Sequence, residues 1–358
     1  MHVPDGFIDA PVSAAAGVLA AGAVAVSLRG ARRELDERTA PLAGLVAAFI
    51  FAVQMLNFPV AAGTSGHLLG GALAAILVGP YTGVLCISVV LLMQGVLFAD
   101  GGLTALGVNI TVMGVVTVIT AHLVFRGLLA VLPRNRGSAL ASAFAAALVS
   151  VPASAAAFTL LYAVGGTTDV PVGKVLAAML GVHVLIGIGE AAITAATVGA
   201  VLAVRPDLVH GVKGLAAPLK LRVGGELVDA PAAEAPAAAG PARSARSGRA
   251  VWAAGLAAAL LLAGFVSFYA SASPDGLEKV AADQGIDAKA DQYEHATADS
   301  PLADYGVKDV DDERLSVGLA GVIGVGATVA VGTGVFWAAR SRRTPAARPA
   351  AHPETSAV

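Results

Sequence analysis

Long apolar segments are the feature that most limits what this chain can fold into. A helix needs about 20 apolar residues to cross the bilayer core. Stretches of about this length or longer, with few charges, occur at residues 11–28, 41–60, 105–132, 138–163 and 172–203. Only 13% of the 358 residues are charged, whereas soluble domains carry about 25%. The chain is therefore predicted to be an all-α integral membrane protein.

A further apolar region, residues 67–98, is interrupted by Gly79-Pro80. A Gly-Pro pair is a strong helix breaker, so this region is predicted to form two shorter helices, at about 67–79 and 82–97. Together with the five longer segments they make seven crossings before the composition changes near residue 205.

The remainder of the chain predicts a second membrane unit. Apolar spans at about 251–270 and 315–339 flank a polar loop, residues 271–314, with twelve acidic residues against four basic ones. A loop of this charge raises the local concentration of cations, although acidic loops are also simply soluble. The predicted domains are a membrane domain at 1–222, an Ala/Pro/Gly-rich linker at 223–250, a two-helix unit at 251–345 and a disordered tail at 346–358.

The positions of arginine and lysine predict the orientation, because cytoplasmic loops are enriched in these residues. With seven crossings, every basic loop falls on one side of the membrane. The N-terminus, the loop around residue 67 and the acidic loop then lie outside the cytoplasm, and the C-terminus lies inside. The basic residues that set this orientation are Arg29, Arg32, Arg33, Arg38, Arg134, Arg136, Arg205, Lys213, Lys220, Arg222, Arg340, Arg342 and Arg343.

The first two residues, Met1-His2, can chelate a metal ion. The α-amine, the amide nitrogen of residue 2 and the imidazole Nδ1 close two fused rings and place three nitrogens in one plane. A fourth nitrogen completes a square, which suits Ni(II) or Cu(II). No basic region typical of a cleavable signal precedes the first span, so we expect Met1 to remain the first residue. A solvated terminal histidine is the alternative.

Several longer stretches resemble a known family. MHVPDGF at 1–7, NFPVAAGTSGHLLGG at 57–71, LLMQGVLFADGGLTALGVNI at 91–110 and GVHVLIGIGEAAIT at 181–194 are similar to the CbiM/NikM family. Its members are the substrate-binding (S) components of energy-coupling factor transporters for cobalt and nickel. SPDGLEKVA, from Ser273, resembles the PDGLE domain, a counterpart of CbiN/NikN. The resemblance implies a seven-helix S-component bundle, followed here by a two-helix membrane unit with an extracytoplasmic loop.

The resemblance also implies the metal ligands. They are the amine of Met1, the amide and imidazole of His2, and the imidazole of His67 in the GTSGH motif. Glycines in that motif let the loop approach the N-terminus, and Pro4 and Gly6 allow residues 1–7 to fold inward. Polar residues on the same side are candidates to hydrogen-bond the ligand histidines or to pack structurally; these are Asn57, Ser65 and Asn109.

His183 and Glu190 lie on one face of a predicted membrane helix, seven residues apart. Ionisable residues within a membrane span are functional candidates. We favour a structural buried pair, or coupling to a partner protein, over metal binding. Asp5 and Asp100 are interpreted as turn or surface carboxylates that could also steer a cation.

The sequence thus predicts a non-enzymatic component that captures Ni²⁺ or Co²⁺ as transported substrate and needs no resident cofactor. No phosphate-binding loop is present, because Gly173-Lys174 is followed by Val175. The resemblance implies a CbiQ/NikQ-like transmembrane coupling subunit and two ATP-binding subunits as partners, and no nucleic acid. The alternatives are a stand-alone secondary metal permease, a metal-binding sensor and, with least support, a membrane enzyme. Nickel and cobalt are not distinguished.

Overall fold

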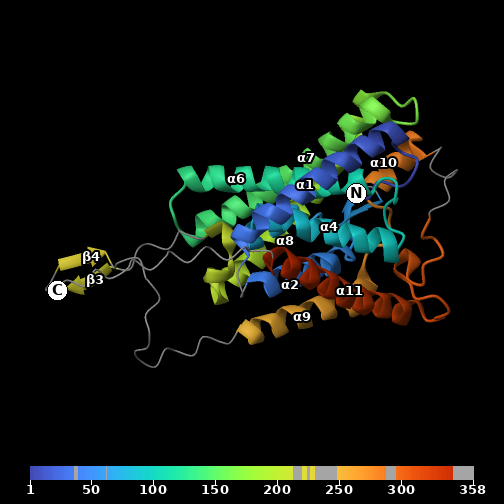
Figure 1. Cartoon of the computed structure of the whole chain (residues 1–358). Helices are drawn as coiled ribbons and strands as arrows, with labels where there is room; N and C mark the ends of the chain where they lie inside the picture. The colour runs from blue at the N-terminus through green and yellow to red at the C-terminus, as the bar shows by residue number, and fades with distance from the viewer. Residues whose placement is uncertain are drawn as a thin grey trace, which may run out of the picture.

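The structure is a computed structural model, and it describes residues 1–35, 39–61, 63–212, 220–223, 226–229, 248–287 and 296–341. The described chain is mostly helical, as Figure 1 shows. The helices of the first unit are α1 (Ala10–Glu34), α2 (Thr39–Gln54), α3 (Gly71–Val78), α4 (Pro80–Leu97), α5 (Leu106–Asn109), α6 (Thr117–Val131), α7 (Arg136–Gly165) and α8 (Val172–Val204).

Seven helices in the described residues are long and apolar enough to cross a membrane. This confirms the prediction of an all-α membrane protein. They are Ala10–Glu34, Pro80–Leu97, Leu106–Val131, Arg136–Gly165, Val172–Val204, Ala250–Tyr269 and Glu313–Arg340. The two remaining predicted crossings are shorter helices, α2 and α3.

Helix α2 ends earlier than the sequence predicts. The predicted span was 41–60, but the helix stops at Gln54 and the chain turns into strand β1 (Phe58–Ala61). Pro59 explains the difference, because proline in a helix removes a backbone donor and clashes with the preceding turn. Strand β1 pairs antiparallel with β2 (Thr64–Gly66), with Phe58 opposite Gly66. The hairpin carries the chain directly to His67.

Helix α3 is also shorter than predicted, at Gly71–Val78 in place of 67–79. Gly70 lies in the left-handed region with φ 85°, and the residues before it are not helical. Non-helical backbone at membrane depth needs hydrogen-bond partners within the protein. The carboxylate of Glu190 on α8 accepts bonds from the backbone N–H groups of Leu69 (2.6 Å) and Gly70 (3.2 Å). The side-chain amide of Gln54 donates to the Leu69 carbonyl (2.9 Å).

The predicted break at Gly79-Pro80 is confirmed, since α3 ends at Val78 and α4 begins at Pro80. Gly79 has φ 98°, a conformation that L side chains rarely adopt. Glu34, at the end of α1, accepts bonds from the backbone N–H of Tyr81 (3.2 Å) and Thr82 (2.7 Å). A carboxylate at the start of a helix is stabilised by the helix dipole.

A π-helical stretch, η1 (Ile110–Val116), joins α5 to α6. Such wide turns are rare and often lie at functional sites. This one directly follows Asn109, which is 2% exposed and contacts the N-terminal segment. The irregularity thus lies where the chain's first residues enter the bundle.

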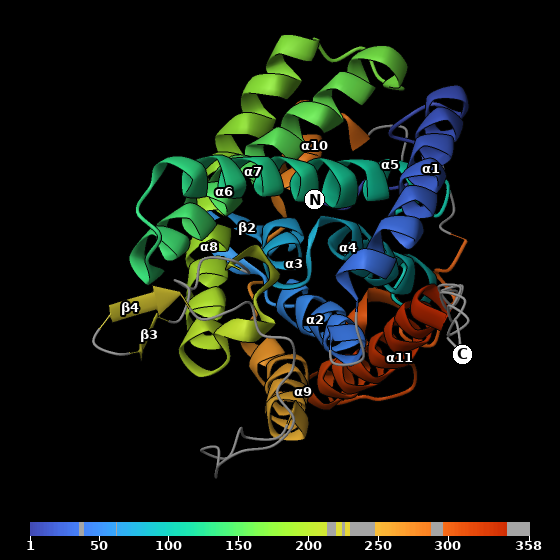
Figure 2. The same cartoon turned by 60° about the vertical axis from the view of Figure 1, so that its left-hand side comes forward.

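The second unit consists of α9 (Gly248–Gly264), α10 (Gly276–Gln284) and α11 (Glu313–Ser341), with short 3₁₀ turns η4 (Val266–Tyr269) and η6 (Ala303–Tyr305). Helix α11 packs mainly along α2, and α9 contacts both helices, as the two views agree (Figures 1 and 2). Close approach occurs at glycines, with Gly44 of α2 against the backbone of Thr333 on α11. Small residues of this kind allow helices to pack tightly in lipid.

A hairpin spans the predicted boundary between the membrane domain and the linker: β3 (Lys220–Val223) pairs with β4 (Glu226–Asp229), with Lys220 opposite Asp229. The rest of the linker up to residue 247, residues 288–295 of the acidic loop and the predicted tail lie outside the described residues.

The loops predicted to share one side of the membrane meet at one end of the bundle. Ile8 forms a β-bridge with Gly166, Ser271 donates to the carbonyl of Asn57 (2.7 Å), and Tyr305 donates to Asp100 (2.6 Å). Figure 1 shows the N-terminus and α10 at this end. Glu34, at the C-terminal end of α1, contacts the start of α4 at the opposite end of the bundle.

Candidate metal site

The N-terminal segment folds into the bundle, as the sequence predicts. Met1 is 2% exposed and Val3 is fully buried, and Figure 2 shows the N-terminus within the ring of helices. The side-chain amide of Asn109 makes two hydrogen bonds to the backbone of Val3: it accepts from the N–H (2.8 Å) and donates to the carbonyl (3.1 Å). Gly102 N–H also donates to that carbonyl (2.9 Å). The backbone after residue 2 is therefore fixed within the protein.

Asp5 belongs to this anchoring and is not a surface carboxylate. It is 7% exposed and accepts bonds from the backbone N–H (2.8 Å) and the hydroxyl of Thr104. Gly6 follows with φ 85°, which turns the chain towards α1. The interpretation of Asp5 as a turn residue fits this geometry, and its oxygen is occupied by Thr104.

The α-amine of Met1 lies 2.6 Å from Nε2 of His67. On the other side of the same ring, Nδ1 lies 3.1 Å from the carbonyl oxygen of Leu68, which can only accept. The proton is therefore on Nδ1, and the lone pair of Nε2 faces the amine. Burial, with the nearby amine charge, lowers the pKa of His67 below its usual 6.5, which favours this neutral form.

The ring of His2 stacks on that of His67, with centroids 5.0 Å apart and an interplanar angle of 12°. Nδ1 of His2 lies 3.0 Å from Asp100, and Nε2 lies 3.2 Å from the amide oxygen of Gln94. Both ring nitrogens thus face hydrogen-bond acceptors. The chelate predicted for residue 2 uses Nδ1, which in this structure contacts Asp100.

Asp100 is therefore part of the site. Burial alone would raise its pKa, but the charge and hydrogen bond of His2, with the hydroxyl of Tyr305, outweigh burial and lower the pKa to about 2. Tyr305 comes from the second unit, stacks on Phe98 at 4.8 Å and also accepts from the amide of Gln94 (3.0 Å). The second unit thereby reaches the surroundings of His2.

Asp275 is a residue of the site that sequence reasoning did not single out. Its Oδ2 lies 2.5 Å from the amine of Met1 and 3.4 Å from Nε2 of His67. Burial alone would raise the pKa of Asp275, but the amine and His67 hold it well below the usual value. His2, His67 and Asp275 each offer a donor atom within 4.8 Å of the others, a grouping that can hold a metal ion. The available signal was its position in the PDGLE motif.

The polar residues expected around the histidines contact the backbone instead. Ser65 is fully buried and donates to the carbonyls of Ser273 (2.7 Å) and Pro274 (3.2 Å), just before Asp275. Asn57 accepts through its backbone carbonyl from Ser271. Asn109 binds Val3, as described above. These three residues position the segments that carry the site.

His183 and Glu190 are both fully buried on α8, but they bind different groups. Glu190 caps α3 through the backbone of Leu69 and Gly70. His183 Nδ1 donates to the Met179 carbonyl (2.8 Å), and its Nε2 has no hydrogen-bond partner in the described part of the chain. The structural interpretation fits Glu190, although these contacts do not make the two residues a pair.

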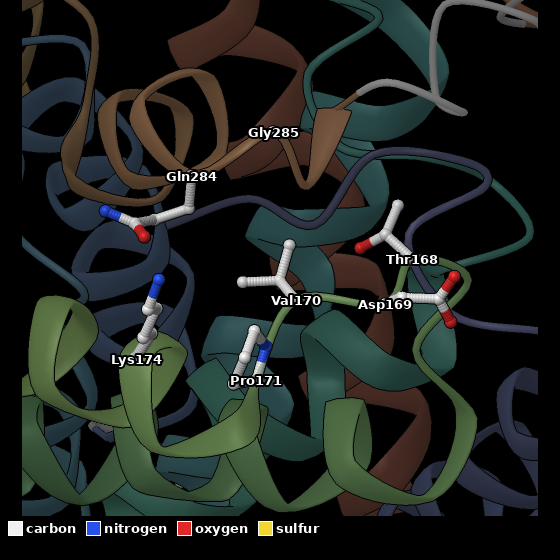
Figure 3. A pocket seen from close by; sticks show the side chains of 7 residues that line it. All are labelled: Thr168, Asp169, Val170, Pro171, Lys174, Gln284 and Gly285. Atoms are coloured by element: carbon white, nitrogen blue, oxygen red, sulfur yellow. The ribbon is translucent and has the colours of Figure 1, made fainter.

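A separate open pocket lies between the loop at 168–171, the start of α8 and the end of α10 (Figure 3). In that view Lys174 points towards Gln284, and Asp169 lies at the opposite side. The residues that line it are Thr168, Asp169, Val170, Pro171, Lys174, Gln284 and Gly285, without a histidine among them. One carboxylate in a pocket that also holds a lysine does not favour a cation, so the candidate site remains the one at Met1.

Comparisons with known proteins agree with this description. Residues 2–208 match the family described as the cobalt uptake substrate-specific transmembrane region, and residues 249–341 match the PDGLE domain. The cobalt transport protein CbiM of Sorangium cellulosum is 34% identical over 58% of this chain and 94% of its own. The fused nickel transport protein NikMN of Rhodobacter capsulatus is 44% identical over 35% of this chain and 36% of its own.

A solved structure is also similar. The crystal structure of a truncated transition metal transporter superposes with a TM-score of 0.50 at 26% identity, covering 57% of this chain and 99% of that one. These relatives are transport proteins, which confirms the expectation that the chain is not an enzyme. The chain therefore belongs to the CbiM/NikM family of membrane transport proteins for cobalt and nickel, in a fusion with a C-terminal PDGLE domain.

Proposed function

We propose that this chain captures Ni²⁺ or Co²⁺ as transported substrate through nitrogen atoms of Met1, His2 and His67. The observation that carries the proposal is the 2.6 Å approach of the Met1 amine to the lone pair of His67 Nε2, in a site where Met1 is 2% exposed. Two donors at right angles on one ion, each about 2.0–2.1 Å from it, lie about 2.9 Å apart. The amine and His67 are already close to this separation.

Capture requires the His2 ring to exchange one partner. Its Nδ1 leaves Asp100 and joins the amine and its own amide nitrogen on the ion, while Nε2–H keeps the oxygen of Gln94 as acceptor. A hydrogen bond on the far nitrogen is the usual way in which proteins orient a ligand histidine. Four nitrogens in one plane favour Ni(II). The match to a cobalt uptake family keeps Co(II) as an equal candidate.

We further propose that the chain works as the S component of an energy-coupling factor transporter. It carries no phosphate-binding loop, so ATP hydrolysis would come from two separate ATP-binding subunits and reach it through a CbiQ/NikQ-like coupling subunit. Helix α1 offers a contact surface for a helix of the coupling subunit. It is little buried and lines a groove of small residues, among them Ala14, Gly17 and Ala21. Small residues allow a second helix to approach closely in lipid.

The proposed orientation places the metal site outside the cytoplasm. The site lies at the end where residues 1–8, 98–104, 166–168 and 271–275 meet, and the basic residues after α1, before α7 and after α8 lie at the other helix ends. The positive-inside tendency supports this arrangement. The proposed domain limits remain 1–222 and 251–345.

The test of the metal site is His67→Ala in the full chain, with calorimetry for nickel and cobalt. Loss of one of four nitrogen ligands should weaken binding by about a hundredfold or more, and His122→Ala on α6 is the matched control. An unchanged affinity in His67→Ala would refute the site.

Purification from a host that expresses candidate partners tests the transporter assignment, because a secondary permease or a sensor would not bring ATP-binding subunits with it.

A further inference from the structure

The C-terminal unit places a carboxylate directly in the candidate site. Asp275 precedes α10 and lies 274 residues from Met1, yet its Oδ2 is 2.5 Å from the α-amine and 3.4 Å from Nε2 of His67. Its side chain is only 16% exposed. The contact therefore joins the two units at the atoms that would hold the metal.

The position of this carboxylate is fixed from both sides. Its other oxygen, Oδ1, accepts from the backbone N–H of Glu278 (2.9 Å), and the Glu278 side chain accepts from the backbone N–H of Asp275 (3.1 Å). This reciprocal capping arrangement begins α10. The preceding carbonyl, that of Pro274, accepts from the backbone N–H of Ser65 (2.8 Å), two residues before His67. One oxygen thus holds the helix, and the other is directed at the site.

The three donor atoms fit around one ion. The amine of Met1, Nε2 of His67 and Oδ2 of Asp275 are separated by 2.5, 2.6 and 3.4 Å. These values bracket the separation of about 2.9 Å between neighbouring donors on a transition-metal ion with bonds of about 2.0–2.1 Å. An ion that binds the first two atoms would have the carboxylate oxygen beside it without any movement of the backbone.

The net charge of the metal complex also favours a carboxylate beside the ion. A divalent ion held by four nitrogens, one of them a deprotonated amide, keeps one positive charge. Charges away from water are costly unless they are paired. Asp275 supplies a compensating negative charge 2.5 Å from the amine and 3.4 Å from His67 Nε2.

We propose that Asp275 is a further ligand of the transported ion, an oxygen donor that the C-terminal unit supplies to the nitrogen site of the first unit. The proposal rests on the proposed function. Without metal, the carboxylate pairs with the α-amine; when the ion takes the amine and His67, Oδ2 becomes a donor outside the plane of nitrogens. With a fifth donor, the site can also hold metals that do not accept a planar geometry.

The test is Asp275→Asn in the full chain. Asparagine is as good a helix N-cap as aspartate, so α10 should still form, while the anionic ligand is lost. Asp283→Asn is the matched control, because Asp283 lies on the same helix, is half exposed and forms its ion pair with Lys279, away from the site. We expect nickel and cobalt affinity to fall by about ten- to a hundredfold in Asp275→Asn and to stay unchanged in Asp283→Asn.

The d–d absorption spectrum and magnetic susceptibility of the nickel complex identify a ligand directly. We expect the wild type to be paramagnetic with a fifth donor, and Asp275→Asn to shift towards the spectrum of planar, diamagnetic nickel. An unchanged affinity, or a weaker affinity with an unchanged spectrum, would overturn the proposal, since the second result assigns Asp275 a charge effect alone. Equal melting temperatures of the two variants exclude misfolding.

The same measurements separate this proposal from the proposed function. If His67→Ala loses binding while Asp275→Asn binds and absorbs as the wild type does, only the carboxylate ligand is refuted. If His67→Ala binds normally, the nitrogen site itself is refuted.

Discussion

At the scale of single residues, the site depends on backbone atoms as much as on side chains. The amine of Met1 contacts both His67 and Asp275, whereas the thioether of Met1 lies 3.4 Å from the hydroxyl of Ser154 in the core. The proposed donors of residues 1 and 2 include an amine and an amide nitrogen. Side-chain substitution alone therefore leaves part of the proposed metal site in place.

An extension of one residue before Met1 should abolish specific metal capture. The amine would become an amide, whose lone pair is delocalised and is a poor donor. The added residue would also have to fit beside Asp275, in a site that leaves Met1 2% exposed. We expect nickel affinity to fall by more than about a hundredfold, about 2.8 kcal/mol.

This prediction is checked by calorimetry on two proteins that differ only in the extension, each purified through a C-terminal tag. Met1→Ala with the new first residue retained is the control, because it keeps the amine and removes the thioether. Equal affinities in the extended and unextended proteins would contradict the assignment of the amine as ligand.

The pH dependence of stability should reveal the buried His67. Its pKa is lowered in the folded protein, so the unfolded state binds more protons at pH values below 6.5. Stability of the metal-free protein should consequently fall as pH decreases through 6.5 towards the folded pKa. Asp100, with a pKa of about 2, stays ionised over this range and adds no slope.

The measurement is the melting temperature in detergent from pH 7.5 to 5, for the wild type and for His67→Gln. The difference between the two curves isolates the contribution of His67. A wild type that loses no more stability than His67→Gln on acidification would contradict a buried neutral imidazole.

At the scale of elements, the short helix α3 is the part of the bundle that needs the most support. It has eight residues, and the non-helical segment before it lies among buried side chains. The carboxylate of Glu190 and the amide of Gln54 satisfy its exposed backbone groups. These contacts fix Leu68, whose carbonyl sets the tautomer of His67. Glu190 on α8 thus holds the backbone beside His67 without contacting the proposed donor atoms.

Glu190→Gln should lower stability and weaken metal binding only slightly. Glutamine keeps one acceptor oxygen but presents an amide N–H₂ to a backbone N–H, so one buried hydrogen bond is lost. The cost of such a loss is about 1–3 kcal/mol. We expect a lower melting temperature with nickel affinity within about tenfold of the wild type.

Glu313→Gln, at the exposed start of α11, is the control for the change of charge. Loss of uptake in Glu190→Gln with an unchanged melting temperature would contradict the capping role and favour a role of Glu190 in the permeation path.

At the scale of the whole molecule, the C-terminal unit is part of the site's enclosure. Its helices pack along α2, and Asp275 and Tyr305 bring side chains to the amine and to Asp100. The cobalt transport protein CbiM of Sorangium cellulosum matches 58% of this chain over 94% of its own length, and the solved structure matches 57% over 99%. The two units meet at the candidate site, and we expect them to be separable.

Residues 1–222 and 251–345, expressed as separate chains in one cell, should associate and restore metal binding. The first piece alone should bind nickel about ten- to a hundredfold more weakly, as expected for Asp275→Asn. The check is co-purification followed by calorimetry, with a second piece carrying Asp275→Asn as the control. Association without any gain in affinity would show that the C-terminal unit does not complete the site.

Much of the fold followed from local sequence, because apolar length and helix breakers act locally. The Gly79-Pro80 break was predicted within two residues. The end of α2 was missed, since the apolar residues around Pro59 resemble a continued span. Asp275 was not foreseen, because twelve acidic residues share its loop and nothing local marks the one that meets a chain end 274 residues away. Asp100 stands alone among the acidic residues of its loop, but its contact with His2 depends on tertiary packing between distant segments, which no local pattern records.

The pairing of Met1 with Asp275 also sets an order of events during synthesis. At 5–20 residues per second, about 15–55 s pass between translation of the first residue and that of Asp275. During this interval the amine lacks its ion pair with Asp275. Once α10 docks, Met1 is 2% exposed, and removal of a formyl group would require the site to open again. A free amine would therefore have to be present before α10 docks against it.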